Sequence, residues 1–162
     1  RPEELYVEKE APTPEQVKIE PKEKELSLLD QFINEDYSLI AYRDGFNFHS
    51  NEMLCQKTNQ IKAEFHVVLD KMICSINTEI YDLKIHLDSK IRGASAALEK
   101  KMEHTIDLKV HDRDLLNNEK SNCDSDKGIV MKQISSYKES YLKGMSDYYE
   151  QKEFAVSTGL FK

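Results

Sequence analysis

Three of the five histidines lie four residues from an aspartate. Residues with this spacing share one face of a helix, so each pair could bind a metal ion or exchange a proton. However, the pairs fall outside the main apolar stripe of the chain, where ion pairs on a solvated helix face are common. We therefore interpret them as surface ion pairs. The pairs are His66–Asp70, Asp82–His86 and Asp107–His111.

Other patterns that support chemistry are absent from the sequence. No histidine follows a glutamate by three residues, as a di-iron helix bundle requires, and the five glycines are too scattered to form a phosphate-binding loop. The cysteines Cys55, Cys74 and Cys123 match neither a zinc nor a redox spacing. We expect no enzyme activity, no cofactor, no metal site and no small-molecule substrate.

The charge of the chain is concentrated at its N-terminal end. Residues 1–36 hold 11 acidic and 5 basic residues, whereas residues 37–162 are close to neutral, which weighs against DNA binding. All four prolines lie within the first 21 residues, and residues 1–26 are predicted to be a disordered linker rich in Pro, Glu and Lys. Such a linker would tether the chain to an upstream domain or to a membrane anchor.

The cysteine content and hydropathy bear on the location of the protein. An odd and sparse set of cysteines favours a reducing compartment over a disulfide scaffold. The sequence contains no apolar run of 18 residues, so we expect no transmembrane helix. The sequence thus favours an intracellular location, on the cytoplasmic side if the arm reaches a membrane.

Helical spacing of apolar residues continues from residue 27 to the C-terminus. Three helices are predicted in a helical domain covering residues 27–162, with approximate bounds of 27–43, 51–116 and 127–156. Ser27 can cap the first helix, and Ser50 or Asn51 can cap the second. A loop of about a dozen residues before the third helix favours an antiparallel return along the long helix.

The long predicted helix carries an apolar stripe that the return helix is too short to cover. Its apolar residues first alternate by three and four and then drift toward fours, which is typical of a helix that supercoils little. We predict that a second copy of the chain, or a helix of another protein, packs on the uncovered half. The predicted interface residues are Leu54, Ile61, Phe65, Leu69, Ile73, Ile76, Ile80, Leu83 and Leu87.

A run of small residues, Gly93-Ala94-Ser95-Ala96-Ala97, interrupts the stripe. In the antiparallel register this run lies opposite bulky aromatic residues of the last helix. We interpret it as an intramolecular packing notch, although a hinge in the long helix and a notch for an outside helix also fit the pattern. The predicted notch residues are Gly93, Ala94, Ala97, Tyr148 and Phe154.

These patterns predict an all-α fold: an elongated antiparallel helical hairpin or coiled-coil-like bundle with a disordered acidic N-terminal arm. The predicted function is a structural scaffold that self-associates, most simply as a homodimer, or binds another helical protein. The second interpretation is a helical adaptor that binds an anionic membrane or nucleic acid. Residues 127–143, with four lysines and one glutamate, would supply its basic surface.

Overall fold

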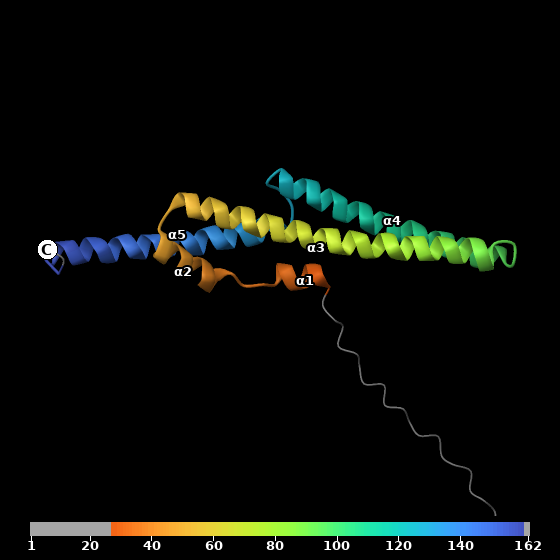
Figure 1. The fold of residues 1–162 in the computed structure, drawn as a ribbon, viewed down its shortest axis with the longest axis horizontal. Coiled ribbons are helices and arrows are strands. Elements are labelled where there is room, and N and C mark those ends of the chain that lie inside the picture. Colours follow the sequence, from red (N-terminus) through yellow and green to blue (C-terminus); the bar gives the residue numbers. More distant parts are fainter. Residues whose placement is uncertain (1–26, 161–162) are drawn as a thin grey trace, which may run out of the picture.

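The computed structural model describes residues 27–160, and every regular element within them is helical, which confirms the predicted all-α class. The molecule is elongated, with the helices lying nearly along one axis (Figure 1). The predicted linker, residues 1–26, lies outside the described residues. In chain order the elements are α1 (Leu28–Ile33), α2 (Ser38–Phe48), α3 (Asn51–His86), the π-helix η1 (Leu87–Ile91), α4 (Ala96–Asp124) and α5 (Val130–Ser157).

The first predicted helix, 27–43, is divided into α1 and α2. Ser27 caps α1 as expected, because its hydroxyl accepts a hydrogen bond from the Asp30 backbone N–H at 3.1 Å. The helix then stops, and α2 begins at Ser38, whose backbone N–H donates a hydrogen bond to Asp36 at 2.9 Å. The predicted end of this helix near residue 43 is wrong, because α2 continues to Phe48.

The predicted continuous helix 51–116 folds back on itself. Ser50 caps α3, but the helical path ends after η1. Gly93 there adopts a left-handed conformation with φ +81°, which glycine tolerates because it has no Cβ atom. Ser95 then caps α4 by accepting a hydrogen bond from the Leu98 N–H. The hinge alternative is therefore the one that the structure confirms, and α3 and α4 form an antiparallel hairpin (Figure 1).

The last helix does not take the predicted path along α4. The expected loop at residues 117–128 is largely helical, because α4 continues to Asp124 and places Cys123 in the core. A short turn with positive φ at Asp126 and Gly128 follows. From there α5 extends away from the end of α4 and packs on α2 and on the first half of α3 (Figure 1).

Two separate cores result from this arrangement. The body, in which α1, α2 and α5 surround the first half of α3, contains the fully buried side chains of Phe65, Leu69 and Tyr141. The hairpin contains a smaller cluster between α3, η1 and α4. Its buried members are Ile80, Leu87, Ile91 and Ile106.

Candidate interaction surfaces

Two glycines bring α2 and α5 into very close contact. A Cβ atom on Gly144 would lie 2.0 Å from the backbone oxygen of Tyr42, and one on Gly45 would lie 1.9 Å from the backbone oxygen of Tyr141. No side chain fits at such distances, so both positions require glycine. Because each glycine lacks a side chain, the backbone of the opposite helix can approach it closely. The pair therefore fixes where the two helices cross.

Tyrosine hydroxyls complete this crossing. Tyr137 donates a 2.6 Å hydrogen bond to the Asp44 carboxylate, which also pairs with Lys57 at 3.1 Å. Burial of the ring, followed by this bond and the negative charge of Asp44, raises the pKa of Tyr137. Tyr42 donates a comparable bond to Asp147 at 2.6 Å. The polar ends of the buried tyrosines are therefore satisfied within the body.

The predicted packing notch does not form. Gly93 lies in the hairpin turn, and nothing is within 4 Å of the position that its Cβ would occupy. Tyr148 instead stacks on His49, with ring centroids 3.8 Å apart, and contacts the edge of Phe46. The prediction failed because α5 packs on α2 and α3 rather than on α4.

The remaining notch residues are exposed. Ala94 lies in the turn that follows η1, and Ala97 lies in the first turn of α4, where neither meets a large aromatic ring. Phe154 is 65% exposed near the end of α5. The small residues therefore serve a chain reversal, for which a short side chain and a helix-capping serine are suited.

The predicted interface stripe is largely buried inside the chain. Ile61, Phe65 and Leu69 belong to the core of the body, and Ile80 and Leu87 belong to the core of the hairpin. The remaining members are partly buried: Leu54, Ile73, Ile76 and Leu83. The expectation that this stripe needs a second chain to cover it is wrong, because α1, α4 and α5 cover it.

Ion pairs across α3 and α4 set the register of the hairpin. Lys120 Nζ lies 2.7 Å from Asp70 Oδ1, and Lys109 Nζ lies 2.5 Å from Glu79 Oε2. These pairs join opposite helices, whereas the sequence suggested pairs within one helix. Because the side chains of these pairs are partly exposed to solvent, each pair contributes at most about 1 kcal/mol to stability. The pairs therefore specify the register of the hairpin more than they stabilise the hairpin.

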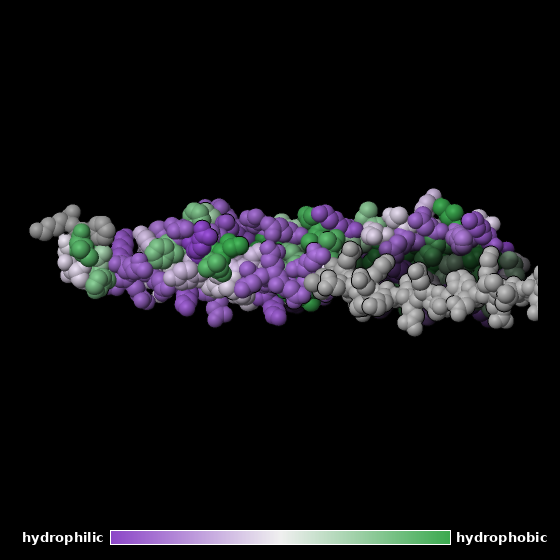
Figure 2. Space-filling model, turned by 90° about the horizontal axis from the view of Figure 1, so that it is seen from below, coloured by the Kyte–Doolittle hydropathy of each residue, from purple (hydrophilic) through white to green (hydrophobic). Residues whose placement is uncertain are grey.

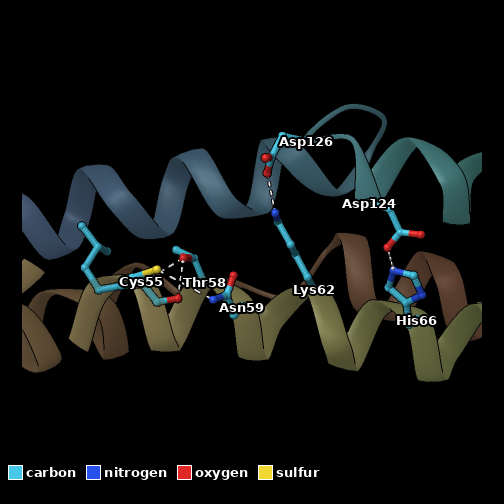
Figure 3. Close-up of polar contacts among 8 residues, drawn as sticks. Cys55, Thr58, Asn59, Lys62, His66, Asp124 and Asp126 are labelled. Carbon is cyan, nitrogen blue, oxygen red and sulfur yellow. Dashed lines mark hydrogen bonds and ion pairs between the residues drawn. The ribbon is translucent and has the colours of Figure 1, made fainter. Parts of the chain in front are cut away.

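His66 shows the same change of partner. Its Nε2 lies 3.0 Å from Asp124 Oδ1, so the predicted His66–Asp70 pair does not form (Figure 3). Lys62 points from the same face of α3 toward Asp126 and forms an ion pair with it (Figure 3). This hydrogen bond raises the pKa of Lys62 and lowers that of Asp126. Both contacts hold the end of α4 on α3.

The three cysteines differ in exposure. Cys123 is fully buried, and its burial raises the pKa of the thiol, which disfavours the reactive thiolate. Cys55 and Cys74 are exposed and free. Within residues 27–160, no group of histidine, cysteine or carboxylate side chains could hold a metal ion, and no helix is long and apolar enough to cross a bilayer.

Among the described residues, exposed apolar side chains lie on α2 (Leu39 and Ile40) and on α4 (Leu98, Leu108 and Leu115), and also on two further surfaces. The first, here named the outer α3 face, lies on the side of α3 away from α4 and comprises Val67, Lys71, Cys74, Thr78, Tyr81, Ile85 and Asp88. The second, the α5 end, projects past α2 (Figure 1) and comprises Tyr149, Phe154, Val156 and Leu160. Figure 2 shows hydrophobic side chains at this C-terminal tip, next to a mainly hydrophilic surface.

Neither of these surfaces was predicted from the sequence. The outer α3 face mixes apolar, polar and charged residues. Its regular spacing is therefore less evident in the sequence than the spacing of the apolar stripe from Leu54 to Leu87. The spacing could still have been found by following every position at intervals of three and four residues.

Comparisons with known proteins provide no further guide, since no family model, curated protein or solved structure matches the chain.

Proposed function

We propose that this protein is a non-catalytic helical interaction module, a scaffold whose elongated frame presents apolar surfaces to another helix. The observation that carries the proposal is the outer α3 face, where Val67, Tyr81 and Ile85 are each about half exposed or more at heptad-compatible spacing. Large apolar side chains on one side of a solvated helix typically mark an interaction site. The apolar stripe of α3, which was predicted from the sequence as an interface, instead packs inside the molecule and stiffens its elongated frame.

The α5 end supports the same function from the opposite end of the molecule. Phe46, Tyr148, Ala155 and Val156 line a depression where α2 stops and α5 continues. The same side of α5 that packs on α2 therefore extends beyond it. An added helix placed in line with α2 would bury this surface. A scaffold with surfaces at separated positions can hold two partners at a fixed spacing.

The adaptor interpretation receives less support from the side-chain positions. Lys132, Lys138 and Lys143 are exposed on α5, which suits an anionic partner. Tyr137 and Tyr141 are buried, however, and their rings are not available for stacking on bases or for insertion at a membrane interface. We place the protein in a reducing compartment, where its free thiols would persist.

Light scattering on a sizing column, at several protein concentrations and two salt concentrations, tests the proposal. We expect the molar mass to rise from one chain toward two as concentration increases, with elution earlier than a compact particle of that mass. A mass of one chain, 18.9 kDa, at every concentration would contradict self-association. Binding to heparin or anionic vesicles that disappears with added salt would favour the adaptor instead.

A further inference from the structure

Building on the proposed function, we infer that the outer α3 face binds the same face of a second copy of this chain, antiparallel, with Lys71 of each copy opposite Asp88 of the other. The spacing, the exposure and the charges of residues 67–92 specify both the partner and the register.

The outer α3 face has the geometry of a coiled-coil seam. Its positions alternate by four and three residues from Val67 to Ile85, which keeps them on one side of α3, and Asp88 follows three residues later in η1. Val67 is 52% exposed, Tyr81 65% and Ile85 49%. Between them, Cys74 and Thr78 line a shallow groove together with Ile73, Asn77 and Tyr81. The seam thus offers apolar ridges and a hollow to an opposing helix.

This seam is independent of the contacts within the hairpin. Ile76, Ile80 and Leu83 face the opposite direction and pack on α4. Beyond Leu69, α3 is covered only by α4, and this part of the hairpin projects away from α1, α2 and α5 (Figure 1). An antiparallel second copy would place its own body past the tip of the first hairpin. The two bodies therefore do not collide.

The charges disfavour a parallel pairing in register. With two copies parallel and in register, Lys71 would face Lys71, and Asp88 would face Asp88 of the other copy. Like charges directly opposed in such a seam are destabilising. In the antiparallel register, each lysine meets an aspartate. Asp88 already pairs with Arg92 at 2.9 Å, but its side chain is 63% exposed and retains acceptor capacity for a lysine.

The charges also select one antiparallel register. With Lys71 opposite Asp88, Cys74 lies opposite Ile85, and Thr78 lies opposite Tyr81. Moving the second copy by one heptad in one direction sets Asp88 against Glu64. Moving it in the other direction sets Lys71 against Ser95, which lies outside α3 and η1. Both alternatives lose the two Lys71–Asp88 pairs, so the first register is favoured.

The acidic N-terminal segment is a poorer match for this face than a second copy. Residues 67–92 contain four acidic residues and four basic residues, whereas residues 1–26 contain eight acidic residues and five basic residues. A balanced face has no net attraction for an acidic segment. It does match its own antiparallel image, because opposite charges then fall opposite each other.

Charge reversal of the full chain tests the inference by sedimentation equilibrium. We expect Lys71→Glu or Asp88→Lys alone to weaken the dimer by about tenfold, because each creates two like-charge contacts per dimer. The double variant should restore affinity to within about threefold of the unmodified chain. Lys100→Glu and Asp112→Lys, which make the same charge changes on exposed positions of α4, are the controls and should have little effect.

Disulfide trapping gives an independent measure of the register. In a Cys55→Ser background, which removes the other exposed thiol, Ile85→Cys should form a covalent dimer with Cys74 of the second copy under mild oxidation. Removing Cys74 by Cys74→Ser should abolish that product. The background chain itself should crosslink poorly, because Cys74 faces Ile85. Efficient crosslinking through Cys74 alone would overturn the antiparallel arrangement.

A dimer that is insensitive to all charge reversals overturns the inference and leaves self-association through another surface, such as the α5 end. A chain that is monomeric at every concentration overturns both. The substituted positions are exposed, so the variants should retain the circular dichroism spectrum of the unmodified chain, and its melting temperature at concentrations low enough for both chains to be monomeric.

Discussion

The two halves of α3 differ in how completely their side chains are buried. In the first half, Phe65 and Leu69 have no exposed surface, because α1, α5 and the end of α4 enclose them. In the second half, Ile80 and Leu87 retain 6% and 5% exposure, because only η1 and α4 are available as cover. Two helices bury one seam and leave the rest of each helix solvated.

This difference implies that the body and the hairpin contribute unequally to stability. Full burial and close glycine contacts should make the body the cooperative unit, whereas the hairpin can open locally. It also explains where an interaction surface can lie. The first half of α3 is enclosed over most of its length, so the free side for another chain begins near Val67 and lies mainly in the second half.

The largest expected effect is in the body. We expect Phe65→Ala to lower the free energy of unfolding by about 3–5 kcal/mol, because its ring is fully buried and lies 5.4 Å, centroid to centroid, from that of Phe32. Urea unfolding followed by circular dichroism measures this change. The matched variant in the hairpin, Ile106→Ala, should cost about 2 kcal/mol and mainly speed hydrogen exchange in the hairpin. Equal decreases in the free energy of global unfolding for the two variants would contradict the unequal contributions of the body and the hairpin.

The second effect concerns the crossing of α2 and α5. Gly144→Ala should destabilise the protein by about 1–3 kcal/mol, because the added Cβ would lie 2.0 Å from the Tyr42 backbone oxygen and the helices would have to separate. Thermal unfolding measures the loss. Lys143→Ala, at the exposed neighbouring position, is the control and should be nearly neutral. A stable Gly144→Ala variant would show that the crossing is looser than described.

The third effect depends on pH. Tyr137→Phe should cost about 1.5 kcal/mol at pH 7 by removing the bond to Asp44. The folded state raises the pKa of Tyr137 above its ordinary value of 10.0, so its contribution is intact below pH 10 and is lost as the pH rises further. Between pH 9 and 11, the free energy of unfolding should therefore fall less for Tyr137→Phe than for the unmodified chain. Urea unfolding at each pH measures this difference. Tyr81→Phe, at an exposed position, should leave that pH dependence unchanged.

The smallest effect is expected at the hairpin turn. Gly93→Ala should cost about 1 kcal/mol, because φ there is +81° while the surrounding space is open. Thermal unfolding measures this cost, and Gly93→Asn should recover part of it because asparagine tolerates the left-handed region. If Gly93→Ala increased stability, the chain would favour the continuous long helix, and the hairpin would be in doubt.

Local signals in the sequence were sufficient to locate most helix starts. Ser27 and Ser50 cap α1 and α3 as predicted, because a serine hydroxyl satisfies a free backbone N–H wherever the helix lies in the fold. The third predicted helix also agrees closely with α5. The break at Asn34–Tyr37 was missed, although an aspartate such as Asp36 can bond the backbone N–H two residues later and so favour a turn.

Long-range choices were not determined by local signals. A segment of Gly, Ala and Ser can continue a helix at small cost or reverse the chain, and the local energies differ by only about 1 kcal/mol. The path of α5 was predicted wrongly for a related reason. The sequence did not reveal that Gly144 and Gly45 serve the same close contact between α2 and α5, because they are far apart in the sequence and meet only at the crossing.

The sequence by itself determined that this protein is helical, that Ser27 and Ser50 cap helices and that one stripe of α3 must be buried, since these follow from spacing and backbone chemistry within a few residues. Only the tertiary structure decided which elements bury that stripe. The folding back at Gly93 and the crossing of α2 with α5 provide the cover that seemed to require another chain. The same packing leaves the opposite side of α3 exposed, because a helix held in a two-helix hairpin buries only the side that faces its partner.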